Sequence, residues 1–142
     1  MKARCRTNAV VVCSTADKQS TPDLHGGQQL LIAQLEHATI QPNWFWNDAW
    51  DGYPLARQRL LEAVAGTNVR NPVFCTGDWH STFVNDLKLD FTDPSQPTIA
   101  TEFVTPAITT GGDDTPYGPY YAPMIPCNPH IQYYEGGAFA RP

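Results

Sequence analysis

Positive charge is scarce in this sequence, and long apolar runs are missing from it. The 142 residues include 9 Lys or Arg against 14 Asp or Glu, which gives a formal net charge of −5. That balance argues against nucleic acid or an anionic membrane as the main partner. No apolar run approaches the roughly 20 residues of a membrane-spanning helix, and no signal peptide is evident after the basic start. A hydrophobic content of 42% still predicts one folded domain with a core of its own.

Cysteine is also scarce, and its spacing excludes two kinds of site. The four cysteines are Cys5, Cys13, Cys75 and Cys127, and no two of them form a Cys-x-x-Cys pair. Neither a zinc knuckle nor a dithiol redox motif is therefore indicated. Cys75 lies inside an apolar run and is predicted to be a small core residue. The spacing assigns no disulfide, so it leaves the cellular compartment open.

The most informative stretch that is present runs from residue 71 to residue 81. Its apolar first half predicts a central strand at 72–76 that is buried on both faces and that Gly77 ends. Asp78 and His80 follow, and side chains two apart in an extended segment point to the same side. A carboxylate and an imidazole that converge beyond a strand end can hold a metal ion or move a proton. The alternative is a polar turn in which Asp78 caps its own backbone and His80 is exposed.

The remaining signals alternate between helix and strand, as in a layered αβ domain. Residues 54–65 form the clearest helix, because Pro54 suits a first turn and Gly66 supplies a stop. The apolar run 29–35 favours a buried strand, although a short helix also fits it. Residues 1–27 are expected to be rich in loops, and 110–126 to form a long surface loop. Further strands are expected at 83–89, 98–104 and 131–134.

Aromatic residues are concentrated between residues 41 and 53. Trp44, Trp46 and Trp50 lie there within seven positions. Such a group can floor a pocket or line a carbohydrate site, or it can pin a loop to the domain. We expect Trp50 and Tyr53 to be mostly buried against the start of the helix, because the turn between them must be fixed.

Five motifs in this order resemble the PhoD-like family of alkaline phosphatases, also called alkaline phosphatase D, one of the calcineurin-like metallophosphatases. The resemblance covers about residues 28–136, and motifs that recur in order are far more specific than any one alone. The motifs are Gln-Gln-Leu-Leu-Ile-Ala at 28–33, Trp-Asp-Gly-Tyr-Pro at 50–54 with Arg57, Thr-Gly-Asp-Trp-His-Ser at 76–81, Thr-Glu-Phe-Val at 101–104, and Asn-Pro-His-Ile-Gln-Tyr-Tyr at 128–134.

The resemblance implies an α/β (α+β) fold, the calcineurin-like β-sandwich flanked by helices. It also implies that only a C-terminal portion of that fold is present. The family's upstream metal motifs, among them a Gly-Asp-Tyr loop, do not occur in residues 1–27. We therefore divide the chain into an unmatched segment at 1–27 and the C-terminal part of a PhoD-like phosphatase domain at 28–142.

The activity that the resemblance implies is metal-dependent hydrolysis of phosphate mono- or diesters. Asp78 and His80 look like the Gly-His-x-His element of the metallophosphatases, with aspartate in place of the first histidine, and so are the expected metal ligands and catalytic residues. The family is associated with Fe³⁺ and Ca²⁺ and with a periplasmic or secreted location. The substrate-binding residues and the roles of His25, His37 and His130 are left open.

Two rival functions remain beside the phosphatase. One is a carbohydrate-binding module that uses Trp44, Trp46 and Trp50. The other is a truncated product without independent function. Separately, two ligands are fewer than a working metal site needs. On either the fragment or the truncation reading, the isolated chain is expected to show little activity.

Overall fold

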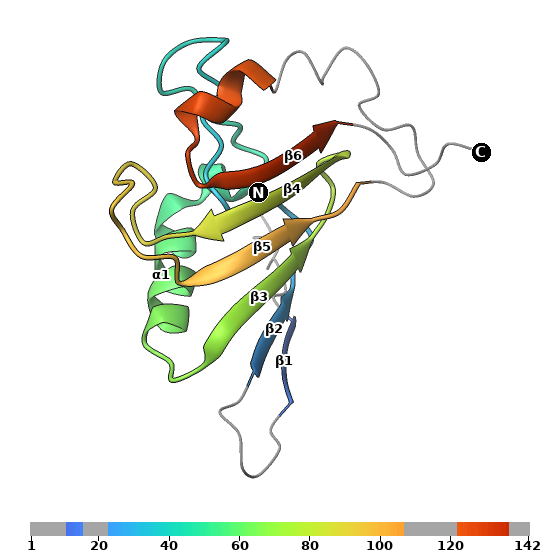
Figure 1. Cartoon of the computed structure of the whole chain (residues 1–142), viewed down its shortest axis with the longest axis vertical. Helices are drawn as coiled ribbons and strands as arrows, with labels where there is room; N and C mark the ends of the chain where they lie inside the picture. Colours follow the sequence, from blue (N-terminus) through green and yellow to red (C-terminus); the bar gives the residue numbers. More distant parts are fainter. Residues whose placement is uncertain (1–10, 16–22, 107–121, 137–142) are drawn as a thin grey trace, which may run out of the picture.

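A single mixed β-sheet dominates the computed structural model, which describes residues 11–15, 23–106 and 122–136. Its six strands lie in the order β1-β2-β3-β5-β4-β6, with one α-helix against one face (Figure 1). The strands are β1 (Val11–Thr15), β2 (Asp23–Gly27), β3 (Arg70–Thr76), β4 (Ser81–Leu87), β5 (Ala100–Val104) and β6 (Ile131–Gly136). The helices are α1 (Pro54–Ala65) and the short 3₁₀ helices η1 (Trp50–Gly52) and η2 (Ala122–Cys127).

The strand directions bring several carboxyl ends to one edge of the sheet. β3 is parallel to both of its neighbours, β2 and β5. β4 is antiparallel to β5 and to β6, and β1 is antiparallel to β2. The loop that follows β3 therefore emerges beside the ends of β2 and β5, the edge at which open α/β sheets place their chemistry.

The expected central strand is confirmed, but its expected burial on both faces is wrong. In β3 the side chains of Pro72, Phe74 and Thr76 are buried, whereas Val73 is half-buried and Cys75 is exposed. Successive side chains of a strand point to opposite faces, and only one face of β3 is covered by the described residues. Cys75 is thus an exposed residue and not the core residue that its apolar neighbours suggested.

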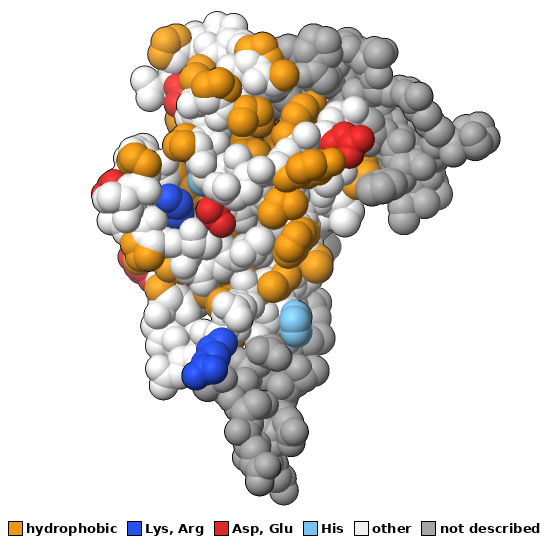
Figure 2. Space-filling view, in the orientation of Figure 1, with side chains coloured by type: hydrophobic (Ala, Val, Ile, Leu, Met, Phe, Trp, Pro, Cys, Tyr) orange, Lys and Arg blue, Asp and Glu red, His pale blue; other side chains and the backbone are white. Residues whose placement is uncertain are grey.

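The uncovered face carries a row of side chains that crosses four strands. Cys75 pairs with Phe103, Phe103 pairs with Val84, and Val84 pairs with Tyr133. Phe103 is 43% exposed and Tyr133 is 49% exposed. Figure 2 shows a band of hydrophobic side chains across the face of the sheet turned to the viewer. This open face, the face of the sheet opposite the core, is therefore a largely apolar surface that the described residues leave uncovered.

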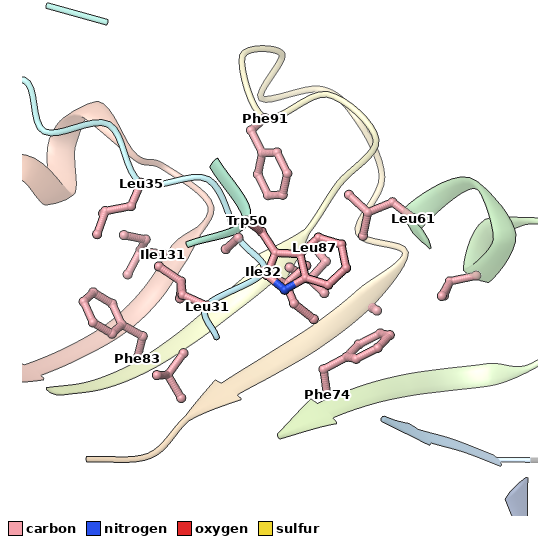
Figure 3. Close-up of a cluster of buried hydrophobic side chains, with 14 of the residues drawn as sticks. Leu31, Ile32, Leu35, Trp50, Leu61, Phe74, Phe83, Leu87, Phe91 and Ile131 are labelled. Carbon is pink, nitrogen blue, oxygen red and sulfur yellow. The ribbon is translucent and has the colours of Figure 1, made fainter. Parts of the chain in front are cut away.

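The core lies on the opposite face, beneath α1 and the segment at 28–35. Figure 3 shows Trp50 with Leu31, Ile32 and Leu87 in this cluster. Other buried members are Leu35, Leu61, Val64, Phe74, Phe83, Phe91, Val104, Met124 and Ile131. The prediction that Trp50 is buried is confirmed, but Tyr53 is 56% exposed, contrary to expectation.

The strand expected at 29–35 does not form, although its apolar residues are buried as expected. Leu31, Ile32 and Leu35 are among the most buried side chains of the chain, yet no ladder of backbone hydrogen bonds runs along the segment. Its amides bond to side chains, as described below. A buried segment must satisfy its amides somewhere, and here carboxylates and an amide replace a neighbouring strand.

The other expected elements mostly appear. Helix α1 has the predicted bounds, with Pro54 in its first turn and Gly66 as its C-cap. The three later strands are confirmed with shifts at their ends. Within the segment expected to be loop-rich, β1 and β2 are strands, and His25 is an exposed residue of β2. Of the loop expected at 110–126, residues 110–121 lie outside the described part of the chain, and 122–126 belong to η2.

Candidate functional site

The loop after β3 is held on both sides by backbone hydrogen bonds. The Gly77 amide donates to the carbonyl oxygen of Gln29 at 3.2 Å. The carbonyl of Thr76 accepts from the Thr105 amide at 3.0 Å and from the Thr105 hydroxyl at 3.2 Å. Gly77 therefore leaves the sheet between the segments that follow β2 and β5.

Asp78 and His80 share an unusual backbone conformation. Their φ angles are 67° and 57°, and no described glycine has a positive φ. Asp and His are among the non-glycine residues that tolerate this left-handed region, but it still costs free energy. Such residues cluster at functional sites. The turn that sets the direction of this loop is thus made by Asp78 and His80 themselves and not by Gly77.

This backbone removes the geometric reason for expecting the two side chains to converge. Alternation with a period of two applies to extended segments, and the segment at 78–80 is not extended. Asp78 is exposed and His80 is half-buried. That the two side chains meet at one ion stays a prediction, which now depends on the resemblance.

The donors at this loop fit a metal ion in kind but not in number. A carboxylate oxygen suits Ca²⁺ and Fe³⁺, and an imidazole suits transition metals. Within residues 11–15, 23–106 and 122–136, no group of three or more His, Cys, Asp or Glu could hold a metal ion. Asp78 and His80 are two donors, whereas a closed site takes four or more.

Aromatic rings connect this loop to the tryptophan-rich segment. Trp79 lies with its ring centroid 6.2 Å from that of His37, and Trp44 meets His37 edge-on at 5.1 Å. Trp46 continues the series 5.8 Å from Trp44. His37 is buried, and desolvation lowers its pKa to about 4. Trp50 is buried in the core instead, so the three tryptophans do not form one exposed sugar platform.

A buried carboxylate behind the loop was not found from the sequence. Glu102 of β5 is fully buried and accepts hydrogen bonds from the amides of Ile32 and Ala33 and from the side chains of Thr76 and Asn85. Burial raises the pKa of Glu102, and these hydrogen bonds oppose that shift. The sequence signal that could have indicated this buried carboxylate is an acidic residue on the inward-facing side of an otherwise apolar strand.

The PhoD-like phosphatase family model matches residues 26–140 of this sequence. The chain belongs to this family. Alkaline phosphatase D of Bacillus subtilis (strain 168) is 33% identical over 108 residues, which are 76% of this chain and 18% of that protein. A solved structure of PhoD matches with a TM-score of 0.64 and 32% identity, over 77% of this chain and 21% of that one. The PhoD-like chain thus spans about a fifth of the length of these relatives.

Two other motifs of this PhoD-like chain fix the segment at 28–36. The Asp51 carboxylate forms an ion pair with Arg57 and accepts from the Leu35 amide at 3.0 Å. Burial raises the pKa of Asp51, while the charge of Arg57 lowers it. Arg57 is buried, with its guanidinium over the ring of Phe91 at 5.3 Å from the centroid. This arginine, which the sequence left without a role, anchors α1.

The Asn-Pro-His motif of the PhoD-like chain fixes the same end of this segment. The side chain of Asn128 accepts from the Glu36 amide at 2.8 Å and donates to the Glu36 carbonyl at 3.0 Å. The Nε2 atom of His130 lies 2.6 Å from the carbonyl oxygen of Gln34 and donates to it. Burial lowers the pKa of His130 to about 4. Asn128 and His130 therefore support the fold of the segment beside the candidate site.

Proposed function

We propose that this chain carries part of the active site of a phosphatase that hydrolyses phosphate mono- or diesters. Asp78 and His80 are the residues that we assign to the reaction. The observation that carries this proposal is the left-handed backbone at both residues, directly after a central strand of a PhoD-like chain. Strain of this kind persists only where the surrounding structure imposes it.

We assign Asp78 and His80 as metal ligands, with Fe³⁺ and Ca²⁺ as the ions that the family resemblance implies. A metal ion in such a site lowers the pKa of a bound water and neutralises charge on phosphoryl oxygens. The Asp78 carboxylate would contribute a hard, anionic donor, and His80 a neutral nitrogen donor. Because no group of three or more such donors lies together among the described residues, the chain alone should bind such ions weakly and turn over phosphate esters near background.

We also propose that the sheet is one half of the β-sandwich of the calcineurin-like fold. Two sheets of a sandwich pack through apolar faces about 10 Å apart. The row from Cys75 through Phe103 and Val84 to Tyr133 is the surface that a second sheet would cover. A periplasmic or secreted location is proposed from the family resemblance. No helix among the described residues is long and apolar enough to cross a membrane.

The decisive experiment replaces the two ligands in a full-length relative that carries the same Gly-Asp-x-His motif. Asp78→Ala and His80→Ala should each abolish most hydrolysis of a nitrophenyl phosphodiester while leaving the fold intact by circular dichroism, because neither side chain fills the core. Glu62→Gln, at an exposed position of α1, is the control and should keep full activity.

The isolated chain gives the complementary test. Its turnover of the same ester should remain near background. Substantial phosphodiesterase activity from this chain that survives Asp78→Ala would mean that the site, and with it the proposed function, is wrong.

A further inference from the structure

The carboxylate of Glu102 has an arrangement that suits a specific task. Its Oε1 atom accepts from the Ile32 amide at 2.7 Å and from the Thr76 hydroxyl at 3.0 Å. Its Oε2 atom accepts from the Ala33 amide at 3.0 Å and from the Asn85 side chain at 2.9 Å. One buried group thus joins β3, β4 and the segment at 28–36 from its own position in β5.

Three of these contacts bear directly on the loop that holds Asp78. Thr76 is the last residue of β3 and immediately precedes Gly77. On the other side, Ile32 and Ala33 belong to the segment whose Gln29 carbonyl accepts from the Gly77 amide. The carboxylate therefore fixes both the strand end from which the loop departs and the segment against which it turns.

We propose that Glu102 is a positioning residue that orients Asp78 and His80. This inference rests on the proposed function of that pair. It acts through Thr76 and through the segment at 28–33, and it does not touch the substrate. Without it, β3 would still pair with its neighbours, but the departure angle of the loop would no longer be fixed. The left-handed turn at 78–80 would then lose the support that such strained backbone requires.

The role requires a carboxylate, and an amide of the same shape cannot replace it. All four partners donate their hydrogen bonds. In Glu102→Gln, the side-chain NH₂ group takes the place of either Oε1 or Oε2. Thr76 or Asn85 can reorient to accept from it, but the backbone amide of Ile32 or Ala33 cannot. Whichever way the amide is turned, one backbone donor faces another donor, which is costly in a buried site.

The first test measures how firmly the loop is held, by hydrogen exchange of the Gly77 amide in the whole chain. Glu102→Gln and Thr76→Val should each speed this exchange by about tenfold, the order expected for one lost hydrogen bond. Thr76→Ser keeps the hydroxyl and should exchange like the parent chain. The Ile99 amide donates to Leu87 at 2.9 Å, at the other end of β4 from the loop, and is the reference for effects elsewhere in the sheet. The proposal is overturned if, in Thr76→Val, the exchange rate of the Gly77 amide changes no more than that of the Ile99 amide.

The second test measures whether the side chains of Asp78 and His80 are oriented to bind one ion, by Mn²⁺-induced broadening of the His80 ring resonances in the same chain. Thr76→Val should weaken Mn²⁺ binding several-fold at unchanged net charge, and Thr76→Ser should restore it.

Asp78→Ala separates the two proposals. If it leaves the broadening intact, the proposed function fails while the exchange result stands. If Asp78→Ala abolishes the broadening and Thr76→Val leaves it unchanged, Glu102 supports the core alone and the positioning role is wrong. The Thr76 pair decides the matter even if Glu102→Gln does not fold.

Discussion

The carboxylate of Asp51 and the guanidinium of Arg57 form an ion pair at the first turn of α1, with only 3% and 10% of their side chains exposed. The same carboxylate accepts from the Leu35 amide. The helix is therefore tied to the segment at 28–36 by charge as well as by apolar packing.

Removing one member of this pair should strongly destabilise the chain. Arg57→Met keeps much of the packing against Phe91 but leaves the Asp51 carboxylate buried without a counter-charge. We expect a loss of about 3–5 kcal/mol, the usual cost of breaking a buried pair. Urea unfolding followed by circular dichroism measures it. Arg59→Met, at an exposed position of the same helix, should change stability by less than about 0.5 kcal/mol. Equal effects of the two variants would contradict the role assigned to the pair.

Stability should fall as the solution is acidified through the histidine range. Burial lowers the pKa of His37 and of His130 to about 4, from an ordinary value near 6.5. Between these values the unfolded chain binds more protons than the folded one, so stability is lost as pH falls from about 6.5 towards 4. Below about 4 both states are protonated and this contribution no longer changes.

Melting temperature measured against pH tests this expectation. His130→Asn should lower the melting temperature at neutral pH, because the bond to Gln34 is lost, and it should flatten the dependence between pH 6.5 and 4. His25→Asn, at an exposed position of β2, should leave the profile unchanged. A His130→Asn profile as steep as that of the parent chain would rule out His130 as a source of the effect.

Gly52 should not tolerate a side chain. A Cβ atom there would lie 2.0 Å from the carbonyl oxygen of Asn47, which is backbone and cannot move aside cheaply. Gly52→Ala should therefore cost about 1–3 kcal/mol, as overpacking does. Gly27 is the matched control, since a Cβ atom there would have nothing within 4 Å. Thermal unfolding of the two alanine variants makes the comparison, and a Gly52→Ala variant as stable as Gly27→Ala would show that the turn at 47–52 has another conformation.

The two faces of the sheet should respond differently to loss of a phenylalanine. Phe83 is 1% exposed and Phe103 is 43% exposed, on adjacent strands. Phe83→Ala should cost about 3–5 kcal/mol, whereas Phe103→Ala should cost under about 1 kcal/mol. Denaturant unfolding of both variants checks the difference. A large loss from Phe103→Ala would mean that the open face is covered in solution.

The helix and most strands could be predicted because their signals are local. Pro54 and Gly66 mark the ends of α1 within the helix sequence itself, and the β-branched and aromatic content of β4 to β6 lies inside each strand. The segment at 29–35 could not be predicted in this way. Its apolar content correctly indicated burial, but the group that satisfies Ile32 is 70 residues away in the sequence. Periodicity carries no information about so distant a partner.

The identity of the candidate site stays a prediction, and its geometry could not be predicted from the sequence. Asp78 and His80 stood out by residue type and by their place after a strand. Gly77 was the natural residue to make the turn, yet the positive φ angles fall on Asp78 and His80. That only one face of β3 is buried was also unpredictable, because an apolar run has the same sequence pattern whether one or both of its faces are covered.

The distance between Ile32 and Glu102 has a consequence for the order in which the chain folds. During synthesis, the apolar run at 30–35 is complete long before β5 exists. Until residue 102 has been made, the amides of Ile32 and Ala33 lack the acceptor that they have in the native fold. Closure of such long loops slows folding, and apolar segments exposed in the meantime favour aggregation. The nascent chain must therefore keep this apolar stretch soluble until β5 emerges.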